Sequence, residues 1–216
     1  MKNIVLYAPP NAGKGTQCEF LVKNHGYKVI SIGDVLRNAR NPETEVGRII
    51  IETQDKGILT PDNIVAEALK GELEKYQGQA IILDGYPRNI DQAKLLDTIL
   101  TDYIVINLTI ERDLAMKRCL GRVTCKDCKR IYNVYFEDMK PKMDGICDDC
   151  GGLLESRSDD NEASMNKRFD VYEENAPKIL DFYKDKNILY QIDSSISKEY
   201  TNEEVEKILN EGMVND

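Results

Sequence analysis

The stretch "YAPPNAGKGTQ", from Tyr7 to Gln17, combines glycines, a lysine and a hydroxyl residue in the manner of a phosphate-binding loop. The usual loop is a glycine, four residues, then glycine, lysine and serine or threonine, placed between a strand and a helix. Here Ala8 replaces the first glycine, and Thr16 follows Gly15 rather than the lysine. A working loop of this kind directs backbone N–H groups and the lysine charge at phosphate oxygens. The alternative is a tight turn with an exposed lysine.

The backbone can accommodate Asn11 and Ala8 at loop positions where glycine is usual. Asparagine tolerates a positive φ better than most residues, so Asn11 can take the place of a loop glycine. Ala8 is harmless if its φ is negative. The loop also lies between an apolar run over residues 3–8 and a helical pattern over residues 15–26, as a nucleotide cradle requires.

A second group of polar residues follows another apolar run, in "IILDGYPRNIDQ". Asp84 ends this predicted strand, and Gly85, Arg88 and Gln92 come after it. A carboxylate at a strand end beside a phosphate loop can hold Mg2+, directly or through water. If Arg88 is considered without its neighbours, the simplest interpretation is a solvated arginine on the surface. The sequence therefore predicts a magnesium-binding carboxylate at Asp84.

Four of the six cysteines form two C-x-x-C pairs, Cys125/Cys128 and Cys147/Cys150, which are separated by 18 residues. This spacing is typical of a tetrahedral zinc site with four thiolates, and such a site leaves no open position for catalysis. We therefore expect a structural zinc ion, although iron or cobalt can bind the same ligands. A redox pair and two disulfides are the alternatives.

Three other reactive side chains are expected to have structural roles and no catalytic or metal-binding role. Cys18 and Cys119 fall in helical patterns and are expected to pack in the core. His25, the single histidine, lies beside a predicted helix end, where it is expected to act as a cap or surface residue and not as a catalyst.

The composition limits the class of protein. The chain has 216 residues, of which 41% are hydrophobic and 31% charged, so it can bury a sizeable core. Its net charge of −9 argues against a general nucleic-acid surface, which needs a basic stripe. No window reaches the apolar length of a membrane span, and the apolar run over residues 4–8 is too short for a signal peptide. We therefore expect a cytoplasmic protein that concentrates positive charge locally if it binds a polyanion.

Short apolar runs alternate with helical patterns, which predicts a parallel sheet with helical crossovers. Such sheets bind ligands at the carboxyl ends of their strands. Residues 121–160 break the alternation, hold both cysteine pairs and are expected to form a small inserted domain. The predicted strands cover residues 3–8, 27–33, 80–85, 103–109 and 188–192. The predicted helices cover residues 15–26, 34–40, 43–57, 61–76, 111–121 and 202–212, with a further one beginning near Glu162.

Five motifs, in order along essentially the whole chain, resemble those of the adenylate kinases and related nucleoside monophosphate kinases. They are "APPNAGKGT", "ISIGDVLR", "LDGYPR", "LGRVTC" and "RSDD". The resemblance implies an α/β fold in which a P-loop parallel sheet is flanked by helices. It also implies three parts: a core (residues 1–30, 61–120 and 161–216), a helical segment that binds the nucleoside monophosphate (31–60) and a zinc-ribbon-like lid (121–160).

By position, the resemblance also implies which residues bind the two nucleotides. On the ATP side these are Asn11, Ala12, Gly13, Lys14, Gly15, Thr16, Arg118 (stacked on the adenine) and Arg122. On the AMP side they are Ile32, Arg37, Leu59, Gly85, Arg88, Gln92, Arg157 and Arg168. The catalytic charges would be Lys14, Arg88, Arg122, Arg157 and Arg168, with Asp84 near Mg2+ and with Asp159 and Asp160 orienting arginines. Phosphoryl transfer depends on such positioned cations and needs no protein nucleophile.

The resemblance thus implies reversible transfer of a phosphoryl group from MgATP to AMP, giving two ADP, by a monomer whose lid closes over the site. The sequence departs from the family where Ile32 replaces a threonine near the acceptor base and where Val123 replaces the second arginine of "GRR". A kinase for UMP or CMP and a nucleotide-binding regulatory protein with little catalysis stay open as alternatives. A zinc-ribbon nucleic-acid ATPase is another, against which the acidic net charge argues.

Overall fold

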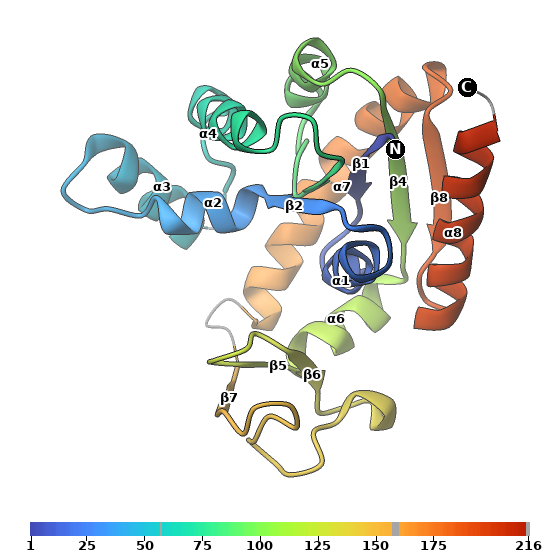
Figure 1. Cartoon of the computed structure of the whole chain (residues 1–216). Coiled ribbons are helices and arrows are strands. Elements are labelled where there is room, and N and C mark those ends of the chain that lie inside the picture. Colours follow the sequence, from blue (N-terminus) through green and yellow to red (C-terminus); the bar gives the residue numbers. More distant parts are fainter. Residues whose placement is uncertain (57, 157–159, 215–216) are drawn as a thin grey trace.

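A five-stranded sheet in the order β2-β3-β1-β4-β8 forms the centre of the protein. The computed structural model describes residues 1–56, 58–156 and 160–214, and Figure 1 shows the arrangement of their elements. All neighbouring strands of this sheet run parallel, which confirms the sequence prediction. The strands are β1 (Asn3–Tyr7), β2 (Lys28–Ser31), β3 (Ile81–Asp84), β4 (Tyr103–Thr109) and β8 (Leu189–Asp193). The helices are α1 (Lys14–His25), α2 (Ile32–Asn38), α3 (Glu45–Asp55), α4 (Asp62–Lys75), α5 (Ile90–Ile99), α6 (Arg112–Leu120), α7 (Glu162–Asp185) and α8 (Lys198–Val214).

The register of the sheet brings two motifs to one edge. Leu6 near the end of β1 pairs with Asp84 at the end of β3, and Ser31 at the end of β2 pairs with the same aspartate. The loop that follows β1 and the carboxylate that ends β3 therefore lie at the same carboxyl edge, where parallel sheets bind ligands.

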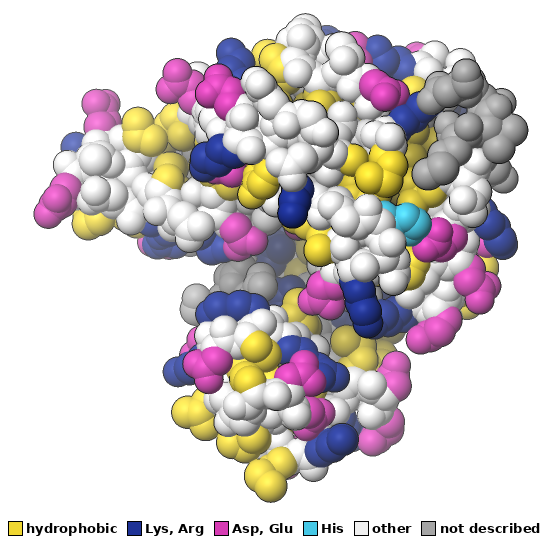
Figure 2. Space-filling view, viewed as in Figure 1, with side chains coloured by type: hydrophobic (Ala, Val, Ile, Leu, Met, Phe, Trp, Pro, Cys, Tyr) yellow, Lys and Arg dark blue, Asp and Glu magenta, His cyan; other side chains and the backbone are white. Residues whose placement is uncertain are grey.

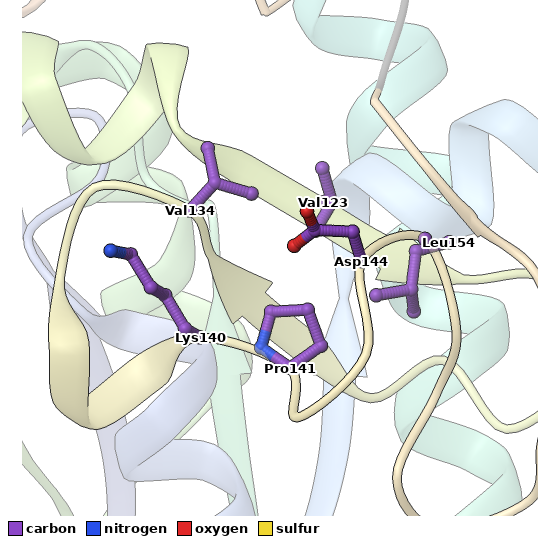
Figure 3. A pocket seen from close by; sticks show the side chains of 7 residues that line it. Val123, Val134, Lys140, Pro141, Asp144 and Leu154 are labelled. Atoms are coloured by element: carbon purple, nitrogen blue, oxygen red, sulfur yellow. The ribbon is translucent and has the colours of Figure 1, made fainter.

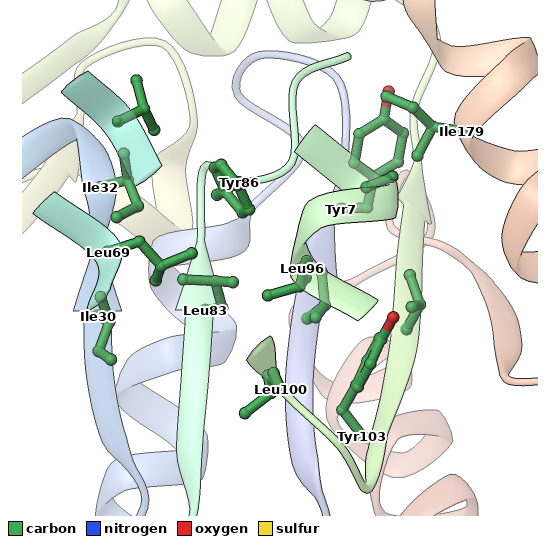
Figure 4. Close-up of a cluster of buried hydrophobic side chains, with 14 of the residues drawn as sticks. Tyr7, Ile30, Ile32, Leu69, Leu83, Tyr86, Leu96, Leu100, Tyr103 and Ile179 are labelled. Atoms are coloured by element: carbon green, nitrogen blue, oxygen red, sulfur yellow. The ribbon is translucent and has the colours of Figure 1, made fainter. Parts of the chain in front are cut away.

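The core consists of two hydrophobic clusters on the two faces of the sheet. Successive strand residues point to opposite faces, and in β1 Ile4 belongs to one cluster and Val5 to the other. Helices α1 and α8 cover the face of Ile4, whereas α5 and α7 cover the face of Val5. Figure 4 shows the second cluster, in which Leu96 of α5 and Ile179 of α7 pack near the sheet. Because both faces are covered, the three inner strands β1, β3 and β4 are apolar at most positions.

A small antiparallel sheet in the order β6-β5-β7 is inserted between α6 and α7. Its strands are β5 (Arg122–Cys125), β6 (Ile131–Asn133) and β7 (Leu154–Glu155), and a short 3-10 helix, η1 (Glu137–Met139), follows β6. Figure 1 shows this part below the main sheet, next to the end of α6, where Asn133 Nδ2 of β6 donates to Arg118 O of α6 over 2.8 Å. It has a hydrophobic cluster of its own around Cys125, Tyr132 and Cys147. The predicted insertion is confirmed, but its strands are too short for a periodic pattern to have revealed them.

The helix boundaries follow local capping groups. Gly26 ends α1 in the left-handed region (φ 75°), as expected of a C-cap glycine. The sequence prediction placed residues 32 and 33 in a strand, but α2 already begins at Ile32 because the Ser31 hydroxyl accepts a hydrogen bond from the Asp34 N–H. Helix α5, whose N-cap is Asn89, was not predicted from the sequence. None of the helices within the described residues combines the length and the apolar character that crossing a membrane requires.

Candidate active site and four-cysteine cluster

The loop between β1 and α1 has the backbone conformation of an anion cradle. Asn11 has a φ of 58° and Gly13 a φ of 96°, so asparagine does take the left-handed conformation expected of it. Ala8 is not among the described residues with a positive φ, and its Cβ therefore causes no strain there. Helix α1 begins at Lys14, directly after Gly13.

The first turn of α1 is left open toward an anion. Gly13 is the N-cap and supplies no side-chain acceptor, and the first turn contains no acidic residue. The N–H groups at a helix start have no partner within the helix and carry a partial positive charge. The turn that begins at Lys14 can therefore donate hydrogen bonds to phosphate oxygens.

Four charged residues from separate elements meet beside this turn. Burial lowers the pKa of Lys14, the nearby Asp84 carboxylate raises it, and the positive charges of Arg168 and Arg88 lower it further. Burial, Arg168 and Arg37 lower the pKa of Arg88, while Asp84 opposes them. The start of α1, the end of β3, the loop after β3 and α7 thus bring three cations around one carboxylate.

Asp84 has an oxygen that suits a metal ion or a metal-bound water. Its Oδ1 atom is buried and accepts no hydrogen bond from any described residue. Buried polar atoms in proteins nearly always have a partner, so an unpaired carboxylate oxygen beside a phosphate loop indicates a ligand. Carboxylate oxygens are the ligands that Mg2+ prefers, and the Asp84 carboxylate therefore fits a Mg2+ ion.

The loop that carries Arg88 is held by a hydrogen-bond network that the sequence had not revealed. Arg88 Nε donates to Gly85 O over 2.9 Å, and the backbone N–H of Arg88 donates to Gln92 Oε1 over 2.7 Å. Gln92 Nε2 in turn donates to Asp62 Oδ1 over 2.7 Å. Gln92 is only 2% exposed, so in this conformation its amide is used by the protein. The signals that could have found the network are Asn89 as an N-cap and Asp62 just after Pro61 at a helix start.

The predicted acceptor residues on α2 lie in different surroundings. The exposed Arg37 forms an ion pair with Asp34 one turn earlier on α2. Ile32 is 2% exposed and packs in the hydrophobic cluster of Figure 4, near Tyr86 and Leu69. Leu59 is half-buried in the connection between α3 and α4. The structure thus places the Ile32 side chain in the core.

The predicted donor residues on α6 and β5 contact groups from other elements. Arg122 forms a two-pronged ion pair with Asp160, with Nε 2.8 Å from Oδ2 and Nη2 bonded to Oδ1. Arg118 Nη2 donates to Ser194 O over 3.1 Å, and burial lowers the Arg118 pKa against the opposing charge of Asp138. The other expected partners at this end, Arg157 and Asp159, lie outside the described residues.

Figure 2 shows a hollow between the arm formed by α2 and α3 and the inserted small sheet. Lys and Arg side chains border it on both sides, although the net charge of the whole chain is −9. A second hollow, of about 430 Å3, lies within the inserted part itself and is shown in Figure 3. It is lined by Val123, Val134, Lys140, Pro141, Asp144 and Leu154, so none of the cations around Asp84 belongs to it.

The four cysteines of the insertion lie together as the spacing predicted. Their Sγ atoms are all within 4.8 Å of one another. The Sγ atoms of Cys125 and Cys150 are 3.4 Å apart, and those of Cys128 and Cys147 are 3.5 Å apart. All four cysteines are free thiols. Thiolates bound tetrahedrally to zinc at ~2.3 Å lie ~3.8 Å from one another. The cluster is therefore compatible with a structural zinc ion, and the disulfide alternative is wrong for this structure.

Tyr132 supports the cluster from the hydrophobic centre of the small sheet. Its hydroxyl lies 3.4 Å from Cys147 Sγ and accepts a hydrogen bond of 2.7 Å from the N–H of Asp148. The hydrogen bond from Tyr132 is the largest cause that lowers the pKa of Cys147 to about 6. A thiolate, the form that binds metal, is thus favoured at this position. No local pattern in the sequence distinguishes Tyr132 from other tyrosines.

The remaining predicted residues in helices lie where the sequence placed them. Cys18 and Cys119 are buried in hydrophobic clusters. His25 is the last residue of α1, and its Nε2 lies 2.8 Å from Glu206 Oε1 on α8. His25 therefore joins α1 to α8 at the end of α1 opposite the phosphate loop.

Comparison with known proteins gives a consistent result along the chain. The sequence profile of the family described as Adenylate kinase matches residues 6–188. An adenylate kinase of Archaeoglobus fulgidus is 38% identical over 213 residues, which cover 96% of this chain and 97% of that protein. One of Caldanaerobacter subterraneus is 39% identical over 212 residues, 95% of each chain, and one of Rickettsia bellii is 37% identical over 209 residues, 95% of this chain and 98% of its own. The chain therefore belongs to the adenylate kinase family.

Proposed function

We propose that the cations around Asp84 carry out the reaction of an adenylate kinase, in which MgATP and AMP give two ADP. The observation that carries this proposal is the meeting of Lys14, Arg88 and Arg168 beside one carboxylate and an open helix start. Phosphoryl transfer requires cations that are already in place when negative charge shifts between the reacting phosphates.

On the donor side, the backbone of residues 11–16 and the Lys14 ammonium group bind the ATP phosphates. Asp84 holds the Mg2+ that comes with ATP, directly or through water, and this ion would neutralise phosphate charge. Arg118 packs on the adenine, and Arg122 contacts the phosphates while Asp160 fixes its guanidinium. These assignments follow the order of the motifs and the positions of the side chains.

On the acceptor side, Arg37 and Arg88 bind the AMP phosphate, and Arg168 contacts the phosphates between the two nucleotides. The resemblance assigns the same role to Arg157, which lies outside the described residues. Ile32, Leu59, Gly85 and Gln92 contact the AMP nucleoside. An oxygen of the AMP phosphate attacks the terminal phosphorus of ATP, and the bond from that phosphorus to the bridging oxygen breaks. Both products are ADP, the electron pair stays on the leaving phosphate oxygen, and no protein atom is bonded to the phosphoryl group.

Water must be kept from the site, because it would compete with AMP for the phosphoryl group. We propose that residues 31–60 and the lid, residues 121–160, close over the core formed by residues 1–30, 61–120 and 161–216. The zinc ion held by the four cysteines stabilises the lid and has no open position for substrate.

Since one chain supplies every group of the site, a monomer suffices. The free thiols suit the reducing cytoplasm, and the acidic net charge fits no nucleic-acid partner.

A coupled assay with ATP and each of AMP, CMP, UMP and GMP tests the proposal. We expect turnover to be highest with AMP and two ADP to form for each ATP consumed. Faster turnover with UMP or CMP would show a different acceptor. Tight nucleotide binding without turnover on any of the four would show a regulatory protein instead.

A further inference from the structure

A carboxylate at the start of α4 contacts the helix that follows the Arg88 loop. Asp62 Oδ1 accepts hydrogen bonds from Gln92 Nε2 (2.7 Å) and from Asn89 Nδ2 (3.0 Å). Asp62 Oδ2 accepts a longer one from the same Asn89 atom (3.2 Å). Asn89 is the N-cap of α5 and Gln92 lies in its first turn. Asp62 therefore joins the first turns of two helices.

Gln92 carries this contact on to Arg88. Its Oε1 accepts a hydrogen bond from the backbone N–H of Arg88, while its Nε2 donates to Asp62. An ionised carboxylate can only accept and a backbone N–H can only donate, so the orientation of the Gln92 amide is fixed at both ends. Because Gln92 is 2% exposed, water cannot readily replace either partner.

The Arg88 side chain depends on the backbone that this network holds. Its Nε donates to Gly85 O within the same loop, and its guanidinium lies in the field of Asp84 and Arg168. A displacement of the loop would move the guanidinium relative to the phosphates, and misplacement by ~1 Å can reduce a rate ~100-fold.

We propose that Asp62 is a positioning residue for phosphoryl transfer, which acts through the Gln92 amide to fix the loop that carries Arg88. The inference rests on the role proposed above for Arg88. It assigns to Asp62 no contact with either nucleotide.

The test is steady-state kinetics of Asp62→Ala and Asp62→Asn. Asp62→Ala leaves the buried Gln92 amide without its acceptor, so we expect kcat to fall by about tenfold to a hundredfold, with little change in the KM for ATP. Asp62→Asn retains the Oδ1 atom that accepts from both Gln92 and Asn89, and should keep kcat within about threefold of the wild type. Equal losses in the two variants, or an unchanged kcat in Asp62→Ala, would overturn the proposal.

Asp91→Ala is the matched control. Asp91 is also an acidic residue in the first turn of a helix, but it is exposed and the structure shows no hydrogen bond of its side chain within the described residues. Both alanine variants remove a charge that interacts favourably with the helix dipole. We expect wild-type kcat in Asp91→Ala. A loss as large as that of Asp62→Ala would show that the helix charge, not the network, is responsible.

A double-mutant cycle with Arg88→Lys separates this inference from the proposed function. If Asp62 acts through Arg88, the loss of kcat in Asp62→Ala/Arg88→Lys is smaller than the product of the two single losses. Independent effects would overturn the role of Asp62 alone, whereas an unchanged kcat in Arg88→Lys would overturn the role of Arg88 itself.

A reciprocal pair of variants decides the matter even if Asp62→Ala does not fold. Gln92→Glu places a second carboxylate against Asp62 and should lower kcat. Adding Asp62→Asn supplies an N–H donor to the new glutamate, so kcat should recover relative to the single variant, while the KM for AMP stays raised because residue 92 also contacts the nucleoside. Failure to recover would count against the proposal.

Discussion

Lys14 places a positive charge where two arginine charges already lie. Burial lowers its pKa, and Arg168 and Arg88 lower it further against the attraction of Asp84. A protein selected for stability alone would not retain this lysine, because a buried charge next to like charges disfavours folding. The arrangement is useful once phosphates, which bring negative charge, occupy the site.

Lys14→Met should therefore lower kcat by roughly a hundredfold or more, since single catalytic donors or charges are often worth ~2.7–4 kcal/mol. The coupled assay with ATP and AMP measures the effect. Lys23→Met is the control, because Lys23 is an exposed lysine in the last turn of the same helix. Unchanged turnover in Lys14→Met would contradict the assignment of the loop as the phosphate cradle.

The same substitution should raise the free energy of unfolding at neutral pH. Below its lowered pKa, Lys14 is charged in both the folded and the unfolded state, and the full burial penalty applies. Above 10.5, its usual pKa, the lysine is neutral in both states and the penalty vanishes. Between these limits the unfolded wild type binds more protons, so its stability relative to Lys14→Met increases with pH. Urea unfolding of both proteins at about pH 7 and about pH 10 measures the difference between their free energies of unfolding, which should be smaller at about pH 10. An equal difference at the two pH values would contradict the prediction.

At the scale of elements, the start of α3 is fixed by a very close backbone approach. A Cβ on Gly47 would lie 2.0 Å from Asn41 O and 2.6 Å from Asn41 N. The N-cap Thr44 accepts a hydrogen bond from the Gly47 N–H over 3.0 Å, so the turn from Asn41 to Gly47 folds back tightly. Since the obstructing atoms are backbone, they cannot move aside as a flexible side chain would.

Gly47→Ala should lower the free energy of unfolding by ~1–3 kcal/mol, the usual cost of overpacking. Gly71→Ala is the matched control, because Gly71 lies within α4 and a Cβ there meets no atom within 4 Å. The control should be neutral or more stable by ~0.5–1 kcal/mol, since alanine favours helix. Thermal unfolding of both variants decides between them, and equal Tm values would contradict the packing argument.

We expect the metal affinity of the four-cysteine cluster to depend on Tyr132 as well as on the four cysteines. Tyr132→Phe removes the hydroxyl that contacts both Cys147 Sγ and the Asp148 N–H. Loss of such an outer contact typically lowers metal affinity ~10- to 100-fold. Competition with a chromogenic zinc chelator measures the effect, and Tyr135→Phe, which alters a half-exposed tyrosine of the same segment, should have wild-type affinity. Equal affinities in the two variants would contradict the role of Tyr132.

At the scale of the whole molecule, the lid and the core are separate packing units. The cluster of Cys125, Tyr132 and Cys147 shares no residue with the two clusters on the faces of the main sheet. Its few buried side chains supply little hydrophobic stabilisation, so we expect this small domain to rely on a metal ion held by the four cysteines.

Removal of the metal should therefore unfold the lid before the core. In hydrogen exchange of chelator-treated protein, we expect the amides of β5 and β6 to lose protection while those of β1 and β4 retain it. The untreated protein is the control, and it should contain about one zinc ion per chain, because structural zinc in peptides binds with ~10–16 kcal/mol. Uniform loss of protection over the whole chain would contradict separate packing units.

Features that depend on neighbours along the chain could be predicted from the sequence. The alternation of apolar runs and helical patterns predicted the parallel sheet, because strand and helix periods are local properties. The glycines and Asn11 of the loop predicted a left-handed backbone, and the paired cysteines predicted a four-thiolate cluster. The order of five motifs predicted the family.

Contacts between groups that are distant along the chain could not be predicted from the sequence. Asp62 and Gln92 are 30 positions apart and are joined through the packing of α4 against α5, and no sequence pattern had predicted α5. The burial of Ile32 in the core, the unpaired oxygen of Asp84 and the lowered pKa of Lys14 likewise depend on surroundings assembled from several elements. Hydrogen-bond partners and local electrostatic fields are set by distances in space, and a sequence pattern does not contain those distances.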